Sequence, residues 1–303
     1  MQERTSPPFV SVIIPVYNDA ARLRTCLQAL LGQTYPSECF EIVVVDNGST
    51  EDLSTGLLDD ARIRVVHEAV PGSYAARNRG LEVATGQVLA FTDADCLPVA
   101  AWLQEAVGAL TTQPPADLVG GPVQLFFEGD GPSSAAELYE ARHGFTQGLA
   151  HGQDFSVTAN MVTWRSVFDR VGDFDATLKS AGDAEFGRRV AAAGGLLRYA
   201  PSAVVRHPAR ATTEELVARV RRITGGTVDM NRNAGATPRR FVLLAARQGY
   251  LLARSLVAVL LLGKPPRGVA AKTRYLGLYV RLRALQAGLY LRAAQGRQAE
   301  SPR

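Results

Sequence analysis

The sequence predicts an α/β fold with a mostly parallel sheet flanked by helices, followed by a C-terminal helical extension that is both basic and apolar. Short runs rich in valine and isoleucine, of the kind buried on both faces of a parallel sheet, predict the strands. Stretches with apolar residues at helical spacing lie between them, as in βαβ units. The chain has 303 residues, 47% of them hydrophobic, which is enough apolar material for one large domain or two smaller ones.

The first hundred residues alternate between these two kinds of element. The predicted strands are residues 10–15, 42–45, 63–66 and 87–92, and the predicted helices are residues 19–31 and 73–84. The third strand is short and is expected near an edge of the sheet. Because parallel sheets bind ligands in the crevice beyond the carboxyl ends of their strands, the polar residues that follow these strands are expected to gather at one rim. This rim is the first indication of a functional site.

The following hundred residues are less regular. The predicted strands are residues 118–123, 156–162, 196–199 and 203–206, and the predicted helices are residues 165–171 and 183–193. Beyond about residue 212 the strand signals give way to basic and apolar helical stretches. We therefore expect one domain over residues 1–235 and a helical extension over residues 236–303.

Two carboxylates follow the predicted strand 87–92, where the chain reads LAFTDADCLP. In extended structure residues i and i+2 point the same way, so Asp93 and Asp95 are expected to repel each other unless something positive lies between them. Solvent, an arginine or a metal ion would serve. Mg²⁺ or Mn²⁺ with a bound diphosphate explains the pair best, because these ions take carboxylate and phosphate oxygens. The simpler alternative is an acidic turn after a strand.

The composition argues against several other classes. A net charge of +4 is too small by itself to indicate a nucleic-acid partner. Cys26, Cys39 and Cys96 are odd in number and lack CxxC spacing, so they predict neither a disulfide framework nor a zinc site. A reduced, cytosolic compartment fits them best. The first ten residues carry charges and prolines where a signal peptide would have its apolar stretch, so we do not expect secretion.

Three stretches, taken in order, resemble a known family. They read VSVIIPVYNDAARLRTCLQALLGQTYP, EIVVVDNGSTED and GSYAARNRGLEVATGQVLAFTDADC. Together they resemble the family 2 glycosyltransferases of the GT-A fold, which is Rossmann-like, over roughly residues 9–235. The resemblance implies an enzyme that moves a sugar from a nucleotide diphosphate to an acceptor hydroxyl and inverts the anomeric centre. It also implies a nucleotide-binding half over about residues 9–115 and an acceptor half over about residues 116–235.

The resemblance implies roles for residues at the rim. The residues it places around the nucleotide are Pro15, Val16 and Tyr17 at the base and ribose, Asp46 on the base, Arg77 beside the nucleotide, and Asp93 toward the ribose. Asp95 would hold the metal, Mg²⁺ or Mn²⁺. The simpler interpretations are that Asp46 is a plain turn residue and that Arg77 is a solvated charge on a helix.

In the acceptor half, the resemblance assigns Asp183 as the general base. The family usually has Glu-Asp here, whereas this chain has Gly182 before Asp183, so the supporting role of the glutamate is missing. An inverting displacement needs such a carboxylate, because the attacking hydroxyl must lose its proton as it bonds to the sugar. A helix N-terminus also favours an acidic residue for structural reasons. His207 lies where many relatives carry a histidine close to the metal or the diphosphate, although a lone histidine is commonly structural.

Residues 241–262 are almost apolar enough for a membrane-spanning helix. Arg247 and Arg254 interrupt this stretch, and each would cost about 3 kcal/mol near the bilayer centre. After a break at residues 264–267, a further basic and apolar stretch follows. We therefore expect residues 241–292 to lie on an anionic membrane surface, with the protein cytoplasmic and peripheral on the inner face of the cell membrane. The alternative is an amphipathic helical pair that packs on the domain or on a second copy of the chain.

These predictions define the expected partners. The donor is a nucleotide-diphosphate sugar, the acceptor is a saccharide or a lipid-linked molecule, and no nucleic acid is involved, which suits polysaccharide or glycolipid assembly. Gly182 leaves a second hypothesis, a catalytically silent nucleotide-sugar-binding scaffold at the membrane. A nucleotidyltransferase with a similar α/β core is a third hypothesis, but the start of the chain has no glycine-rich, lysine-bearing phosphate loop.

Overall fold

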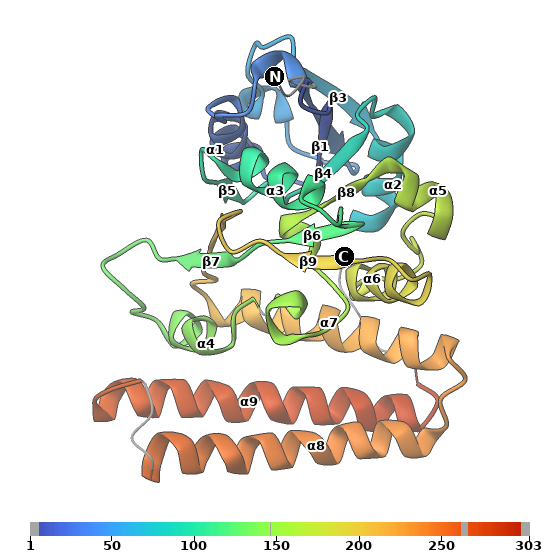
Figure 1. The fold of residues 1–303 in the computed structure, drawn as a ribbon. Coiled ribbons are helices and arrows are strands. Elements are labelled where there is room, and N and C mark those ends of the chain that lie inside the picture. Colours follow the sequence, from blue (N-terminus) through green and yellow to red (C-terminus); the bar gives the residue numbers. More distant parts are fainter. Residues whose placement is uncertain (1–5, 146, 262–265, 298–303) are drawn as a thin grey trace. The chain divides into compact units, whose positions relative to one another are not determined.

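The computed structural model describes residues 6–145, 147–261 and 266–297. The chain forms two compact units, whose elements are labelled in Figure 1. The sheet unit consists of Met1–Gln124, Thr146–Thr177 and Gly182–His207, and the helical unit consists of Leu125–Phe145, Leu178–Ala181 and Pro208–Arg303. Residues 262–265 of the predicted apolar stretch and break, and residues 298–303 of the predicted extension, lie outside the described residues.

The sheet unit is built on a seven-stranded sheet with the order β3-β2-β1-β4-β8-β6-β9. Its strands are β1 (Val10–Val16), β2 (Phe40–Asp46), β3 (Ile63–His67), β4 (Val88–Phe91), β6 (Leu118–Gly120), β8 (Met161–Trp164) and β9 (Leu197–Tyr199). β1, β2, β3 and β4 are parallel, β6 and β9 are parallel, and β8 runs antiparallel to β4 and β6. The mostly parallel sheet and the edge position of the strand at residues 63–67 confirm the prediction.

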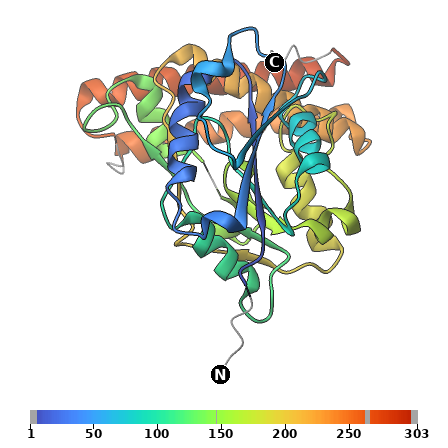
Figure 2. The same cartoon turned by 90° about the horizontal axis from the view of Figure 1, so that it is seen from above.

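Helices cover both faces of this sheet. They are α1 (Ala20–Leu31), α2 (Ser73–Val83), α3 (Trp102–Thr111), α5 (Arg165–Val171) and α6 (Gly182–Ala192). Figure 2 shows α1 in dark blue and α2 in cyan on opposite sides of the first strands. α1 buries Leu23, Leu27 and Leu30, which recur at helical spacing. α2 approaches β1 closely at Gly80, where a Cβ would come within 2.5 Å of the Ile13 side chain.

Two predicted strands of the acceptor half have different bounds in the structure. The predicted strand 156–162 begins only at Met161, because Thr158–Asn160 forms a 3₁₀ turn. The Asn160 amide there donates to the carbonyls of Pro122 and Ala203 at 3.0 and 2.8 Å, and its Oδ1 accepts from the Trp102 indole. The predicted strand 118–123 is divided into β6 and β7 (Val123–Phe126), since Pro122 offers no amide hydrogen to a sheet. Short β5 (Leu97–Pro98) pairs antiparallel with β10 (Val205–Pro208).

The described residues of the helical unit form four main helices. They are α4 (Ala135–His143), α7 (Thr213–Asn233), α8 (Pro238–Leu256) with a π-helical end at Val257–Leu261, and α9 (Val269–Ala294). α4 and α7 both begin with a capping box, at Ser134 and Thr212. Leu216 of α7, Tyr275 and Leu282 of α9 and Val259 belong to one core cluster, in which each is fully buried.

α8 and α9 form an antiparallel hairpin, drawn in orange and red in Figure 1. Three hydrogen bonds fix the register: Arg283 to Gln248 at 3.0 Å, the Tyr279 hydroxyl to the carbonyl of Leu251 at 3.2 Å, and the hydroxyls of Ser255 and Tyr275 at 3.0 Å. The residue numbers rise on one helix as they fall on the other, as antiparallel neighbours require. α4 and α7 belong to the same compact unit as this hairpin. The boundary expected at residue 235 divides a catalytic domain from an extension by function, and it stays a prediction.

Candidate active site

The rim residues lie at the carboxyl ends of three neighbouring strands. Val16 ends β1 and is aligned with Asp46, the last residue of β2, while Asp93 follows the end of β4, which pairs with the other side of β1. Pro15 and Val16 are in the strand, and the Val16 side chain is buried, whereas Tyr17 beyond it is exposed. This is the crevice where parallel α/β sheets bind ligands.

The Asp46 carboxylate is held in place by its own turn. Oδ1 accepts a hydrogen bond from the Ser49 amide at 2.9 Å, and Oδ2 lies 3.1 Å from Nδ1 of His67 on the neighbouring strand β3. Asn18 ties this turn to the end of β1, because its side-chain oxygen accepts from the amides of Thr50 and Glu51. Asp46 is therefore a turn residue and is also fixed at the rim. His67 and Asn18 were not predicted as site residues.

Asp93 and Asp95 each have a separate partner, an arginine for Asp93 and a histidine for Asp95. The chain turns directly after β4, with the Cys96 amide donating to the Asp93 carbonyl at 3.0 Å, so the extended geometry expected for this pair was wrong. The Arg77 guanidinium of α2 pairs with Asp93, and Nε2 of His207 on β10 lies 3.2 Å from Asp95. Arg77 is 3% exposed, which contradicts its interpretation as a solvated helix charge. Solvent, an arginine or a metal ion was expected to relieve the repulsion between the two carboxylates, and for Asp93 it is an arginine.

Asp95 and His207 have the right chemistry for a divalent cation. Donor atoms of Asp95, Cys96 and His207 all lie within 4.8 Å of one another. A carboxylate oxygen and an imidazole nitrogen suit Mn²⁺, whereas Mg²⁺ prefers oxygen ligands throughout. Burial, together with the neighbouring carboxylates of Asp93 and Asp95, holds the pKa of the Cys96 thiol well above its usual range. Cys96 is therefore a neutral side chain here, and the two residues beside it are the better ligands.

Asp183 lies in the first turn of α6, and desolvation by the surrounding protein raises the pKa of its carboxyl group. Three weaker influences oppose this rise: the hydrogen bond from the Ala184 amide to Oδ1 at 2.8 Å, the nearby charge of Arg77 and a backbone hydrogen bond from Thr158. The Tyr74 hydroxyl also contacts this residue. It donates to Oδ1 over 3.5 Å and accepts from the Asp183 amide at 3.2 Å.

Tyr74 explains the glycine at position 182. A Cβ on Gly182 would lie 2.8 Å from two ring carbons of Tyr74, closer than real Cβ atoms come to their neighbours. The tyrosine ring is 5% exposed and also lies under the Arg77 guanidinium, 5.6 Å from its ring centroid. The space that a glutamate side chain at position 182 would need to leave the backbone is therefore occupied. Tyr74 was not among the predicted site residues, although the glycine in place of the usual glutamate is a signal for a bulky neighbour.

The predicted site residues therefore form two groups joined by side-chain contacts, and Asp46 lies apart from both. Arg77 and Asp93 join Asp183 through Tyr74, while Asp95 joins His207. Asp46, at the end of β2, contacts His67. Carboxylates at fixed positions, a buried guanidinium and a possible cation site are the parts needed to bind a diphosphate beside a proton acceptor.

Comparisons with known proteins identify the family and the fold. Residues 11–172 match the family model described as Glycosyl transferase family 2. The chain is 38% identical to the glycosyltransferase AglE of Haloferax volcanii over 210 residues, which covers 67% of this chain and 68% of that protein. It is 32% identical to the pre-mycofactocin glycosyltransferase of Mycobacterium tuberculosis over 218 residues, covering 69% of this chain but only 45% of that protein.

Two solved structures are similar in fold. The mannosyltransferase PcManGT from Pyrobaculum calidifontis, in complex with GDP-Man and Mn²⁺, has a TM-score of 0.58 and 20% identity, covering 96% of this chain and 74% of that one. TarS of S. aureus has a TM-score of 0.53 and 21% identity, covering 71% of this chain and 39% of that one. The fold and the rim thus define a transferase of the GT-A class. The chain belongs to glycosyltransferase family 2.

Proposed function

We propose that this chain transfers a sugar, with inversion, from a nucleoside diphosphate bound at the rim to a hydroxyl of a saccharide or lipid-linked acceptor. The observation that carries the proposal is the connection through Tyr74. Its hydroxyl contacts Asp183, and its ring lies against Arg77, which pairs with Asp93. A donor-binding group and a candidate base are thus held next to each other by one buried side chain.

On the donor side, Pro15, Val16 and Tyr17 would line the base and ribose, and the fixed carboxylate of Asp46 would accept a hydrogen bond from the base. The Arg77–Asp93 pair would sit between the ribose and the diphosphate. Nε of Arg77 is buried and has no hydrogen-bond partner in the described part of the chain. A buried donor of this kind is costly to leave unpaired, which supports a ligand atom as its partner.

Asp95 and His207 would hold a divalent cation, Mn²⁺ or Mg²⁺. Bound there, the ion would stabilise negative charge on the departing nucleoside diphosphate. The imidazole of His207 is almost fully buried beside the Asp95 carboxylate. It would therefore orient that carboxylate toward the ligand.

Asp183 would act as the general base. Its carboxylate would take the proton from the acceptor hydroxyl as that oxygen bonds to the sugar carbon, while the bond to the diphosphate breaks on the opposite face. A raised pKa makes the ionised carboxylate a stronger base than an ordinary aspartate. The same shift requires the pH to be above this raised pKa, so activity is expected to rise as pH increases through it.

The test is Asp183→Asn, compared with wild type for nucleoside diphosphate release from a panel of sugar nucleotides with Mn²⁺. We expect transfer to fall by at least about a hundredfold, as when a general base is removed. Donor binding, followed as a thermal shift with the nucleoside diphosphate and Mn²⁺, should be retained. A wild-type protein that binds donor but releases no product would favour the silent scaffold instead.

For the helical unit we propose contact with an anionic membrane surface, with the protein on the cytoplasmic face. Between Asp229 and Glu300 the sequence has thirteen lysines and arginines and no acidic residue. α8 buries Phe241 and Ala245 but exposes Leu243 and Tyr250. An exposed apolar stripe among arginines is typical of helices that lie in a membrane interface.

Among the described residues, Pro238–Leu261 is long and apolar enough to cross a membrane by length and composition alone, a criterion that core helices also meet. Contact with the surface accommodates Arg247 and Arg254, which spanning would place in hydrocarbon. The test is sedimentation with vesicles of phosphatidylcholine alone or with phosphatidylglycerol, using wild type and Leu243→Glu/Tyr250→Glu. We expect binding only to the anionic vesicles, and its loss in the variant. Equal sedimentation of both proteins would exclude this face, and a change in oligomeric state would indicate a second copy instead.

A further inference from the structure

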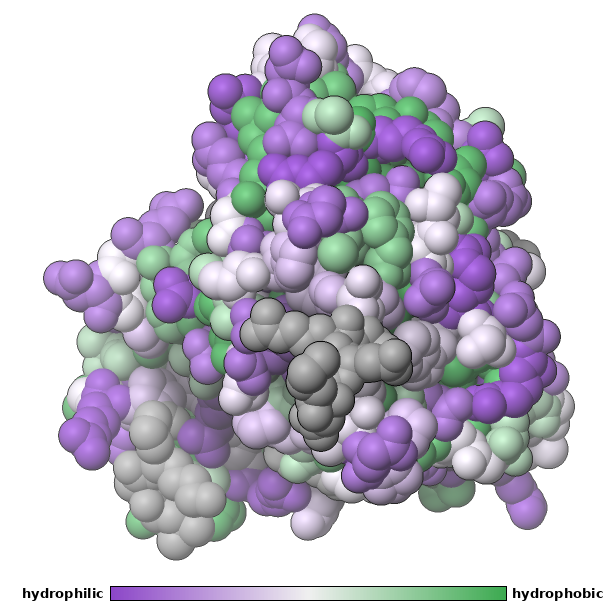
Figure 3. Space-filling model, turned by 45° about the horizontal axis from the view of Figure 1, so that its top comes forward, coloured by the Kyte–Doolittle hydropathy of each residue, from purple (hydrophilic) through white to green (hydrophobic). Residues whose placement is uncertain are grey.

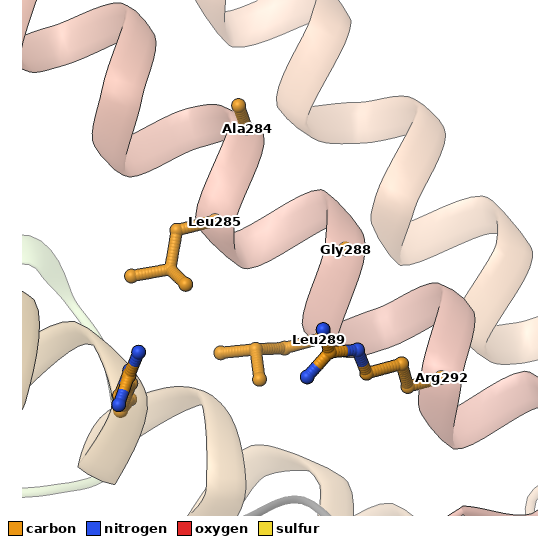
Figure 4. A pocket seen from close by; sticks show the side chains of 6 residues that line it. Ala284, Leu285, Gly288, Leu289 and Arg292 are labelled. Atoms are coloured by element: carbon orange, nitrogen blue, oxygen red, sulfur yellow. The ribbon is translucent and has the colours of Figure 1, made fainter.

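A cavity of about 240 Å³ lies between α7 and α9 of the helical unit. Figure 4 shows Leu285, Leu289 and Arg292 extending from α9 toward it. Ala284 and Gly288 of α9 complete an apolar floor, and the guanidinium of Arg221 comes from α7. The cavity thus combines an uncharged, water-repelling floor with a positive charge at each side.

Among the described residues the two guanidiniums have no protein anion to bind. In the described residues neither Arg221 nor Arg292 forms an ion pair or a side-chain hydrogen bond, whereas Arg219, two residues before Arg221, pairs with buried Glu140 at 3.1 Å. The helical neighbours three and four positions away from each arginine include no acidic residue. Within the described part of the chain, nothing therefore competes with an outside anion for the charge at the cavity.

The size and the lining determine what kind of anion would fit. Two arginines favour a phosphate, whose oxygens accept several charge-assisted hydrogen bonds at once. Leu285 and Leu289 favour hydrocarbon rather than a sugar or a base. A volume near 240 Å³ is below the roughly 300–1,000 Å³ of sites that enclose whole drug-sized molecules. It suits part of a larger molecule better than a complete nucleotide sugar.

We propose that this cavity binds the phosphate head group of an anionic membrane lipid, with the phosphate between Arg221 and Arg292 and the start of the lipid chain over Leu285 and Leu289. The inference rests on the proposed membrane contact and extends it, because it adds a defined head-group site to a general attraction between charges. It is independent of sugar transfer and of the rim.

Gly288 offers a way to fill the cavity. A Cβ at this helical position meets no atom within 4 Å, and the same is true of Gly277, eleven residues earlier on α9 and not among the lining residues. Gly288→Leu should therefore occupy the floor, and Gly277→Leu is its matched control. The charge test is Arg221→Gln/Arg292→Gln, with the exposed pair Arg267→Gln/Arg281→Gln as a control that removes the same charge.

The measurement is calorimetric titration of the full chain with dihexanoyl phosphatidic acid below its micelle concentration, and in parallel with inorganic phosphate. We expect the lipid phosphate to bind more tightly than inorganic phosphate. Gly288→Leu should weaken lipid binding about tenfold or more because it fills the site, and the Arg221/Arg292 variant should do so because charge-assisted contacts are lost. Both controls should stay within about twofold of wild type, since neither touches the lining.

Unchanged lipid binding in both cavity variants would overturn the proposal, and so would inorganic phosphate binding as tightly as the lipid. Circular dichroism of each variant separates lost binding from lost folding. The Leu243→Glu/Tyr250→Glu variant distinguishes this site from the general membrane contact, because it should lose vesicle binding and keep the soluble lipid. Nucleoside diphosphate release is unaffected by either outcome.

Discussion

The rim of the sheet unit and the surface of the helical unit hold their charges in opposite ways. At the rim each carboxylate has its own partner: Asp93 pairs with Arg77, Asp95 with His207 and Asp46 with His67. In the α8–α9 hairpin the cations have no acidic residue of their own segment to pair with. Figure 3 shows hydrophilic and hydrophobic residues interspersed over one face of the molecule.

This difference separates two ways of binding an anion. Paired side chains at fixed positions are preorganised, so a ligand meets groups that need little rearrangement. Unpaired arginines on an amphipathic helix supply a less directional attraction, which weakens with salt. The rim therefore suits the recognition of one kind of molecule, and the hairpin suits a surface with many negative charges.

The largest effect is expected where a rim pair is broken. Asp95→Ala removes the only carboxylate of the proposed cation site and should abolish Mn²⁺-dependent transfer, a loss of about 10²-fold to 10³-fold or more. Asp93→Ala leaves Asp95 and His207 in place and should mainly weaken donor binding. Nucleoside diphosphate release and Mn²⁺ titration of both variants check the comparison. Equal Mn²⁺ affinity in wild type and Asp95→Ala would contradict it.

In the helical unit, a buried carboxylate is paired with two arginines, much as the carboxylates of the rim are paired. Removing this carboxylate is expected to cause the largest loss of stability. Glu140 is fully buried and accepts from Arg210 at 3.0 Å and from Arg219 at 3.1 Å. Glu140→Ala would leave two cations near the core without a partner, which costs about 3–5 kcal/mol. Thermal unfolding should show a large fall in Tm. Glu128→Ala, at an exposed position, should change the free energy of unfolding by less than about 0.5 kcal/mol.

Much of the sheet unit could be predicted from local patterns. β1 and β2 are runs rich in valine and isoleucine, which indicate burial on both faces. The acidic residues lie at or just after strand ends, with Asp46 the last residue of β2 and Asp93 two residues after β4. Two helices were missed. In the sheet unit, α3 was missed although Trp102, Ala106 and Leu110 recur at helical spacing. In the helical unit, α4 was missed although Ser134 and Glu137 form a capping box that is readable in the sequence.

The details of the site were set by contacts that no local pattern contains. Asp93 and Asp95 do not lie on an extended strand, because the chain turns at once to form β5. Tyr74 and Asp183 are 109 residues apart in the sequence, yet the tyrosine ring determines that position 182 has no side chain. The ring on α2 occupies the space that a side chain on α6 would need. This complementarity can be recognised only when the positions of both helices are known.

The smallest expected effect is that of Tyr74→Phe, which separates the role of the tyrosine ring from that of its hydroxyl. Tyr74→Phe keeps the ring that excludes a side chain at position 182 and removes only the hydroxyl near Asp183. Without that donor the ionised carboxylate is less stabilised, so the pKa of Asp183, already raised by desolvation, should rise further. The acid limb of the pH dependence of kcat should then move to higher pH by less than about one unit, since one hydrogen bond contributes about 0.5–1.5 kcal/mol.

Tyr35→Phe is the matched control, because its hydroxyl donates to the Pro8 carbonyl and does not contact Asp183. A shift of the acid limb in Tyr74→Phe alone would identify the hydroxyl as a positioning group for Asp183. Loss of activity at every pH, without a shift, would mean that Tyr74 acts only through packing. Gly182→Ala completes the comparison, because its Cβ would displace the ring itself. It should therefore impair transfer more than Tyr74→Phe does, although it adds a single methyl group and removes no polar atom.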